Sequence, residues 1–299
     1  MNKKELFEYL RIKPASIKKQ GSATIITTSN HKYVAKKNNR KADSFEYLQT
    51  RNFNNFPKIY SHLNDEILLM DYIEDSKIPR EQKLQDLVYL DSILHNKTTF
   101  YKDVDDDYIK EIYEDILEKQ NTIYQYYNEL QNVIELEVYM SPSNYLLVRN
   151  ISLIYMSLNQ SKKYIEEWYH LISEKHKVRY AYIHGNLEEQ HLIENDNLYF
   201  ISWDHSRIDL PIYDLEIFYR KSFMNISLKE ILEIYESKYP LNREEYLLLI
   251  ALLLIPKKID ITSKEYDKVK KVTELILYTD KLLSFLENNS DKSNHHAYH

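Results

Sequence analysis

The sequence predicts an α+β protein with two lobes, a small lobe built on an antiparallel sheet and a large, mainly helical lobe after it. Short β-prone runs occur between residues 22 and 70, and apolar residues recur at three- and four-residue steps after Pro79. A polar segment, residues 71–78, separates the two patterns. We therefore expect an N-terminal β-rich lobe over residues 1–73 and a helical lobe over residues 74–289.

The small lobe is expected to contain a hairpin, one helix and two further strands. Residues 22–37 alternate on both sides of a polar break, which is typical of a β-hairpin. Asp43 can cap a helix that ends before Pro57. Residues 58–62 and 67–70 are short β-prone runs, so we expect them to complete the sheet.

The large lobe is expected to be built from amphipathic helices. Two long apolar stripes at helical spacing, within residues 109–134 and 151–172, are rich in Tyr. At this spacing we assign the Tyr side chains to packing and not to a ligand surface. Residues 180–183 and 198–203 are short β-prone runs around a polar loop, and residues 290–299 are expected to form a disordered tail.

Composition excludes several classes of protein. The net charge of −6 gives no general attraction to nucleic acid or to an anionic membrane. The chain has no Cys, which excludes disulfides, thiolate metal sites and a Cys nucleophile, and fits a reducing cytoplasm. The longest apolar run, residues 246–255, is about half a membrane span. We therefore expect a cytoplasmic protein with no nucleic-acid partner and no membrane crossing.

The most informative stretch is YIHGNLEEQHLIENDNLYFISWDHSRIDLPIYDLE, residues 182–216. It resembles the HGDxxxxN loop, the following IDxD-type strand end and the PxYDL ending of the aminoglycoside phosphotransferase and choline kinase group, which includes bacterial spore-coat kinase-like proteins. YVAK, DYIE and LHNKT segments precede it in the order typical of that group. The resemblance covers most of the chain and implies a protein-kinase-like fold, in which His184 braces the loop.

The resemblance also implies a nucleotide site. Lys36 of YVAK and Glu46 of the following helix would form the ion pair that positions the phosphates of ATP, and the chain near Met70 and Tyr72 would contact the adenine. The sequence gives little support for a phosphate-binding loop, because Gly21 is the one glycine near the first strands and no Gly-rich turn follows it.

The sequence departs from the family pattern at the three positions that carry phosphoryl transfer. Asn186 replaces the Asp that accepts the proton of the attacking hydroxyl, His191 replaces the metal-binding Asn, and Ser202 replaces the Asp that bridges metal and phosphates. An amide cannot accept that proton, and loss of a general base removes roughly a hundred- to ten-thousand-fold of rate. Mg²⁺ prefers anionic oxygens, whereas the imidazole of His191 suits Zn²⁺ or other transition metals.

Asp204 offers a second way to build a metal site. It lies two residues after Ser202, so its side chain would point to the same side if the strand continued, displaced by about 6 to 7 Å. A loop could close that gap, but a structural or solvated role for Asp204 is the favoured interpretation. His191 and Asp204 are the candidate metal ligands, and the binding of Mg²⁺ stays open.

These departures favour a pseudokinase, a kinase-fold protein that works by binding or by assembly. Its ligand would be a nucleotide or small molecule, a protein partner is open, and a role in spore-coat assembly follows by analogy alone. The alternative is an active ATP-dependent small-molecule phosphotransferase whose metal site is rearranged around Asp204. The acceptor cannot be named from the sequence.

Overall fold

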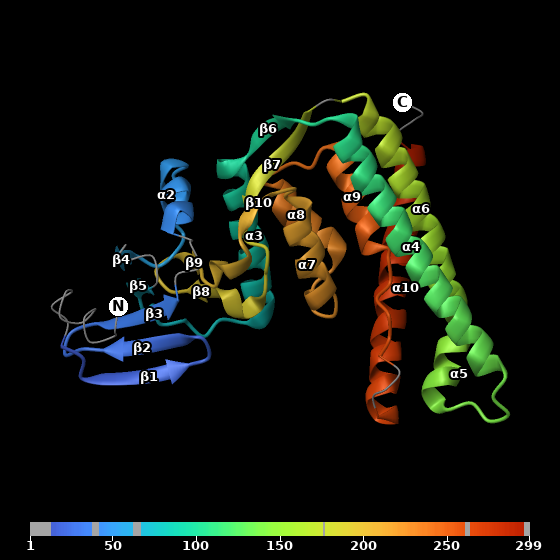
Figure 1. Cartoon of the computed structure of the whole chain (residues 1–299), viewed down its shortest axis with the longest axis horizontal. Helices are drawn as coiled ribbons and strands as arrows, with labels where there is room; N and C mark the ends of the chain where they lie inside the picture. The colour runs from blue at the N-terminus through green and yellow to red at the C-terminus, as the bar shows by residue number, and fades with distance from the viewer. Residues whose placement is uncertain (1–12, 38–41, 62–66, 176, 261–263, 296–299) are drawn as a thin grey trace. The chain divides into compact units, whose positions relative to one another are not determined.

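The computed structural model describes residues 13–37, 42–61, 67–175, 177–260 and 264–295. The chain divides into two compact units: unit 1 is residues 1–99 with 181–209, and unit 2 is residues 100–180 with 210–299. The antiparallel sheet lies in unit 1 and the long helices in unit 2 (Figure 1), so the expected α+β fold is confirmed. The lobe boundary near residue 73 stays a prediction.

Unit 1 begins with a five-stranded antiparallel sheet in the order β1-β2-β3-β5-β4. The expected hairpin is β2 and β3, in which Thr24 lies opposite Ala35. Its turn is closed by Thr28, whose Oγ1 accepts the backbone N–H of His31 at 2.9 Å. The strands are β1 Ser16–Gln20, β2 Ala23–Thr27, β3 Lys32–Lys37, β4 Ile59–Ser61 and β5 Ile67–Asp71.

Strand β1 was not predicted from the sequence. All five of its residues are exposed, and because no face of the strand is buried, its sequence SIKKQ does not need the apolar–polar alternation that marks a half-buried strand. It forms because its backbone pairs with β2 along its whole length, with Ser16 opposite Thr27 and Gln20 opposite Ala23. An edge strand rich in Lys is also poorly suited to further pairing with other chains.

Helix α2, Ala42–Thr50, follows β3 as expected, with Phe45 and Leu48 buried, but it begins before Asp43, which is therefore not its cap. Asp43 lies in the first turn of the helix, where a carboxylate interacts favourably with the exposed N–H groups. The helix ends at Thr50, and Asn52 follows with a left-handed φ of 57°, a conformation that Asn tolerates better than most residues.

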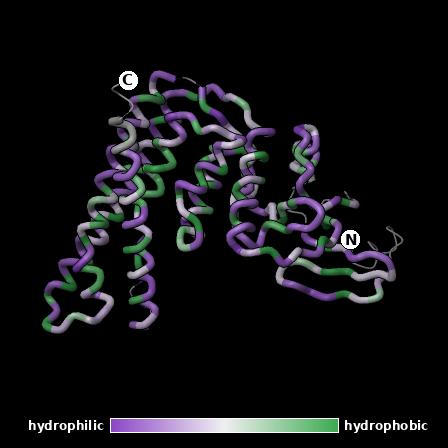
Figure 2. Tube along the Cα trace, turned by 180° about the vertical axis from the view of Figure 1, so that it is seen from behind, coloured by the Kyte–Doolittle hydropathy of each residue, from purple (hydrophilic) through white to green (hydrophobic). Residues whose placement is uncertain are grey.

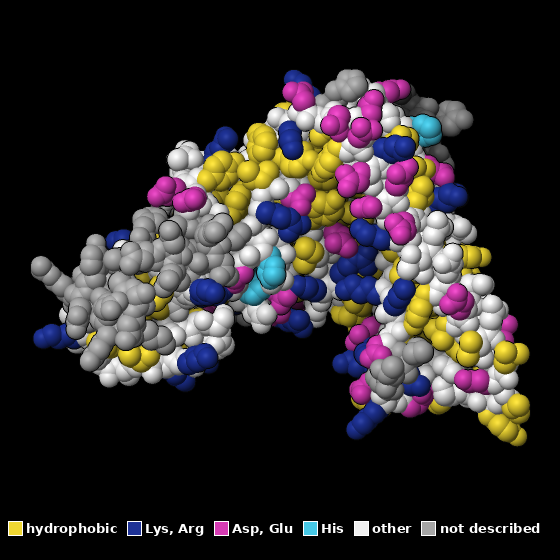
Figure 3. Space-filling model, viewed as in Figure 1, with side chains coloured by type: hydrophobic (Ala, Val, Ile, Leu, Met, Phe, Trp, Pro, Cys, Tyr) yellow, Lys and Arg dark blue, Asp and Glu magenta, His cyan; other side chains and the backbone are white. Residues whose placement is uncertain are grey.

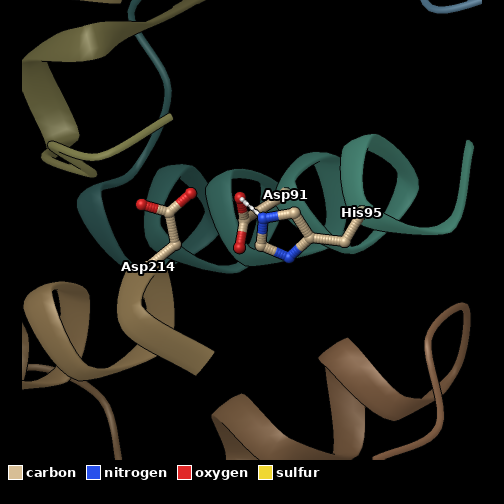
Figure 4. Close-up of side chains that lie close together, drawn as sticks. All are labelled: Asp91, His95 and Asp214. Atoms are coloured by element: carbon tan, nitrogen blue, oxygen red, sulfur yellow. Dashed lines mark ion pairs between the residues drawn. The ribbon is translucent and has the colours of Figure 1, made fainter. Parts of the chain in front are cut away.

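Helix α3, Arg80–Thr98, carries the LHNKT segment at its C-terminal end. Asp91 and His95, one turn apart, are fully buried, and 3.5 Å separates the carboxylate from Nε2 (Figure 4). Thr98 ties the helix end to the next part of the unit, because its Oγ1 accepts the backbone N–H of Tyr182 at 3.0 Å. This contact gives the Thr of LHNKT a structural role.

The rest of unit 1 is a series of short elements around the HGN loop. The end of β7, Lys177–Ile183, pairs antiparallel with β10, Arg207–Asp209. Between them lie a 3₁₀ turn η1, Glu189–His191, the strand pair β8, Leu192–Glu194, and β9, Leu198–Phe200, and a second 3₁₀ turn η2, Trp203–His205.

Unit 2 is mainly helical, and apolar and polar residues alternate along its long helices (Figure 2). Strand β6, Phe100–Asp103, pairs with the first residues of β7. The two predicted Tyr-rich stripes lie on the long helices α4 and α6, and Trp168 of α6 is buried. The helices are α4 Asp106–Glu135, α5 Pro142–Arg149, α6 Ile151–Ser173, α7 Ile212–Ser222, α8 Leu228–Glu236, α9 Arg243–Leu253 and α10 Glu265–His295.

Side-chain hydroxyl groups join the helices of unit 2. Tyr126 donates to the carbonyl of Ile259 at 2.5 Å, and Tyr127 donates to that of Lys257 at 2.5 Å. Ser157 and Ser161 of α6 donate to the last carbonyls of α9 and its cap at 2.6 Å each. The Tyr side chains of α4 thus both pack and satisfy backbone groups after α9.

The turn between α4 and α5 exposes apolar side chains (Figure 3). Leu136 is 85%, Val138 88% and Tyr139 92% exposed. Helix α10 continues to His295, into the segment that the sequence predicts to be a tail, and residues 296–299 lie outside the described residues. None of the helices in the described part of the chain combines the length and apolar character needed to span a bilayer.

Candidate functional site

The HGN loop begins at a close approach of two backbone segments. Gly185 has a φ of 76°, and a Cβ at this position would lie 2.2 Å from the carbonyl oxygen of His205. No side chain fits there, and few residues other than Gly adopt that φ. The loop after β7 can therefore approach the 3₁₀ turn η2 this closely only because residue 185 has no side chain.

Two buried imidazoles brace this loop. His184 donates from Nε2 to the carbonyl of Ile201 at 2.9 Å, and His191 donates from Nδ1 to the carbonyl of Asn186 at 2.7 Å. Because a carbonyl oxygen only accepts, each of these ring nitrogens carries the hydrogen. The two rings lie 5.8 Å apart, and His191 spans the loop from its end to its start. The structure thus gives both imidazoles a bracing role.

Ser202 has an unusual backbone conformation. Strand β9 ends at Phe200, and Ser202 follows in the left-handed region with φ 63° and ψ 49°. The condition that the strand continues to Asp204 is therefore not met. The chain turns at Ser202 into η2, which redirects Asp204 and leaves the seryl position in a conformation that costs roughly 1 to 2 kcal/mol for most residues.

Lys36 of β3 forms an ion pair with Asp204 of η2. The Lys36 side chain is 18% exposed and that of Asp204 is 35% exposed. The two line a cavity of about 30 Å³ together with Ser202 and side chains of β4, β5 and α2, which leaves space for about one or two water molecules. A cavity that holds a whole ligand is usually about ten times larger. A phosphate group that reached Lys36 would first have to displace Asp204.

Trp203 is the centre of an aromatic cluster that was not recognised in the sequence. Its ring centroid lies 5.1 Å from that of His184, 6.0 Å from Phe45 and 5.9 Å from Phe200, and its Nε1 donates to the carbonyl of Phe200 at 3.0 Å. Phe53, Phe56 and Tyr182 complete the cluster. The cluster fixes the turn that carries Asp204, since the residue before Asp204 is anchored on several sides.

The other predicted nucleotide contacts lie in the same unit. Glu46 is an exposed residue of α2, and its predicted pairing with Lys36 stays a prediction. Met70 of β5 lines the small cavity, whereas Tyr72 follows β5 and lies under the ammonium of Lys32, 5.4 Å from its ring centre. The backbone N–H of Tyr72 donates to the carbonyl of Lys32 at 3.1 Å. That donor is thus already used within the sheet.

Asp71, between Met70 and Tyr72, influences the side chains around the end of β5. Burial and then the hydrogen bond to Asp71 raise the pKa of Tyr60 to about 12. The imidazole of His31 lies 3.9 Å from the Asp71 carboxylate. Tyr60 lies on β4 and His31 in the turn before β3, so both sides of the sheet end meet at the Asp71 carboxylate.

The groups at the predicted catalytic positions do not fit Mg²⁺ in this arrangement. The carboxylate of Asp204 is paired with Lys36, Nδ1 of His191 is bonded to the backbone, and Asn186 and Ser202 offer neutral oxygens. Mg²⁺ requires hard, preferably anionic oxygens in octahedral geometry. Asn186 also lacks the carboxylate that would accept a hydroxyl proton.

No protein-family model matches the sequence, and no curated protein sequence matches it. Solved structures do match the fold. An aminoglycoside phosphotransferase from Alicyclobacillus acidocaldarius superposes with a TM-score of 0.72 at 12% identity, covering 94% of this chain and 93% of that chain. The AMP-bound spectinomycin phosphotransferase APH(9)-Ia superposes with a TM-score of 0.53 at 14% identity, covering 94% and 98%. The chain therefore has the protein-kinase-like fold of the aminoglycoside phosphotransferases.

Proposed function

We propose that this protein is a pseudokinase, which keeps the phosphotransferase fold but does not transfer phosphate. The ion pair between Lys36 and Asp204 carries this proposal. The Lys that would hold nucleotide phosphates is occupied by a carboxylate of its own chain, inside a cavity of about 30 Å³. The Asn at position 186 points the same way, because its amide cannot accept the proton of an attacking hydroxyl.

Within this proposal the protein works by binding a nucleotide or small molecule, or by assembling with a protein partner. The AMP-bound spectinomycin phosphotransferase supports an adenine nucleotide as the ligand class. A cytoplasmic location and a role in spore-coat assembly, the latter by analogy, belong to the same proposal. Nucleotide binding should be weak and independent of Mg²⁺, since Asp204 competes for Lys36.

The second candidate is an active small-molecule kinase that uses ATP. One observation favours it: η2 places the Asp204 carboxylate in the same cavity as Ser202, the position of the missing metal-bridging Asp. In this hypothesis Asp204 leaves Lys36 when nucleotide and metal arrive. The two candidates therefore assign opposite roles to the same carboxylate, competitor in one and ligand in the other.

The substitution Asp204→Ala separates the two candidates. If the protein is a pseudokinase, removal of the carboxylate frees Lys36, and calorimetry should show ATP binding about tenfold tighter than in the natural chain, with or without Mg²⁺. If it is an active kinase, the same change should abolish Mg²⁺-dependent binding and all turnover. ATP hydrolysis by the natural chain, above a heat-inactivated control, would refute the pseudokinase proposal.

Restoring the family residues provides a complementary test. The triple change Asn186→Asp, His191→Asn and Ser202→Asp should create Mg²⁺-dependent nucleotide binding, because it returns two carboxylates and an amide ligand to the site. The matched control combines the triple change with Lys36→Met, which removes the phosphate contact and should return binding to the level of the natural chain. If the triple variant folds and gains no metal dependence, the assignment of these three positions is wrong.

A further inference from the structure

Unit 2 contains a cavity of about 680 Å³ that no part of the proposed function uses. It lies between one face of α4, one face of α7 and the segment after α9, where Lys and Arg side chains gather (Figure 3). Its size is within the range of about 300 to 1,000 Å³ that is typical of small-molecule sites. The lining includes Lys119, Ile123, Arg220, Lys221, Ile255 and Lys257.

Arg220 forms a fixed part of the cavity wall. Its guanidinium pairs with Glu216 one turn earlier on α7, and it donates to the carbonyls of Leu252 at 2.5 Å and Ile255 at 3.2 Å. It also lies 5.6 Å from the ring centre of Tyr278. These contacts hold the α7 wall to the segment after α9 and compensate the charge of Glu216.

Lys257 has a different environment. Its ammonium makes no hydrogen bond or ion pair with any residue that the structure describes, and its side chain lies at the cavity. Desolvation, followed by the charges of Arg220 and Lys221, lowers the pKa of Lys257, while Glu216 acts in the opposite direction. Positive groups crowded in this way are stabilised when an anion binds between them.

The lining also has an apolar part and an acidic part. Ile123, Ile217, Ile255 and Pro256 supply apolar surface, which favours a ligand with an apolar body. Asp115 and Glu118 of α4 lie at the same cavity and disfavour a second large negative charge. The lining thus suits a compact ligand with one anionic group better than a polyanion.

We propose that this cavity binds a small organic anion, a phosphomonoester or carboxylate with an apolar body, with Lys257 as the principal contact of the anionic group. Lys119 and Lys221, from the two helix walls, supply further positive charge around it. The site lies wholly within unit 2 and is independent of Lys36 and Asp204. Its test therefore needs no nucleotide, and its failure would leave the proposed function untouched.

Binding of phenyl phosphate, measured by calorimetry on the full chain at pH 8, is the direct test. We expect a saturable complex, with benzoate also bound and benzyltrimethylammonium not bound. Lys257→Gln should weaken phenyl phosphate binding about tenfold, because a charged hydrogen bond is lost, and Lys257→Arg should restore binding to within about threefold. The matched control is Lys258→Gln, whose ammonium lies 5.2 Å from the ring centre of Tyr126, and it should change binding less than about twofold.

Two further measurements make the outcome decisive. As the pH is raised, binding should weaken before the pH reaches the usual pKa of Lys, because the lowered pKa of Lys257 makes it lose its proton early. The charged groups around Lys257 at the cavity are Lys119, Arg220, Lys221, Glu216, Asp115 and Glu118. If Lys257→Gln unfolds, Lys119→Gln takes its place and should weaken binding about threefold. Absence of phenyl phosphate binding at millimolar concentration, an equal loss in Lys258→Gln, or tighter binding of benzyltrimethylammonium would overturn the proposal.

Discussion

Two cavities of this protein, one in each unit, differ in how their charges are arranged. In unit 1 a cavity of about 30 Å³ contains a Lys and an Asp that neutralise each other, beside a packed aromatic cluster. In unit 2 a cavity of about 680 Å³ has several cations, and among them Lys119 and Lys257 make no hydrogen bond or ion pair with the residues that the structure describes. The charges of the small cavity in unit 1 thus compensate each other, whereas those of the larger cavity in unit 2 are not all paired. A shared fold does not by itself say where a chain binds its ligand.

The largest effect is expected from a test of the close approach in unit 1. Gly185→Ala should lower the free energy of unfolding by about 3 kcal/mol, since the new Cβ would overlap the His205 carbonyl and the left-handed φ is unfavourable for Ala. Urea unfolding followed by circular dichroism measures the change. Gly21→Ala is the matched control: its φ of 55° is also left-handed, but nothing lies within 4 Å of the added Cβ.

The control variant should lose about 1 kcal/mol, from backbone strain alone. Equal losses in the two variants would show that Gly185 is needed for its φ and not for the contact with η2.

A smaller effect should follow from breaking the ion pair. Asp204→Asn should lower the free energy of unfolding by about 1 to 2 kcal/mol, because the largely buried Lys36 ammonium loses its carboxylate. The exposed Asp196, which accepts from the hydroxyl of Tyr199 at 3.0 Å, provides the control variant Asp196→Asn, with an expected change below about 0.5 kcal/mol. If Asp204→Asn had the same free energy of unfolding as the natural chain, the ion pair would contribute nothing to the stability of the protein.

Ser202 allows a test with the opposite sign. Ser202→Gly should raise the free energy of unfolding by about 0.5 to 1 kcal/mol, because Gly adopts φ 63° without strain and this gain exceeds the entropy it adds to the unfolded chain. The midpoint of urea unfolding should therefore increase. A decrease would show that the Ser202 side chain stabilises η2.

The smallest effect concerns unit 2 and depends on pH. The backbone N–H of Ser143, in the first turn of α5, and then Lys268 lower the pKa of Glu265 to about 2. A depressed pKa means that the stabilisation is fully present above the ordinary value of 4.5 and is lost as the pH falls toward about 2.

Glu265→Gln should therefore lower the melting temperature slightly at pH 6, and the difference from the natural chain should shrink between pH 4.5 and pH 3. A difference that is constant over this range would exclude the carboxylate as its source.

Much of the fold could be predicted from the sequence because local patterns determine it. The hairpin, α2, β4, β5 and the long helices follow alternation and helical spacing, and the LHNKT and PxYDL segments occur on helices. Strand β1 could not be predicted, since its exposed Lys residues carry no alternation. The β-prone runs at residues 180–183 and 198–203 were expected on either side of the HGN loop. Strand β10 was not, because its three residues are too few and too polar to show a β-strand pattern.

The candidate site was less predictable because it depends on backbone geometry and on distant partners. The motif located Lys36, Ser202 and Asp204, but their spacing could not reveal that the chain turns at Ser202 or that Asp204 meets Lys36. The cavity of unit 2 draws its lining from residues near 119, 220 and 257, which no local pattern connects. Lys257, in particular, has no sequence signal that distinguishes it from Lys258.

The chain has two Trp residues, and the structure places one in each unit: Trp203 within the aromatic cluster and Trp168 on α6. Both are buried, at 6% and 4% exposure, so each should shift its fluorescence emission when its own surroundings open to water. A chain with Trp168→Phe would report optically on the first unit alone, and a chain with Trp203→Phe on the second. Comparing their emission during denaturation would show whether the two units melt together or in sequence.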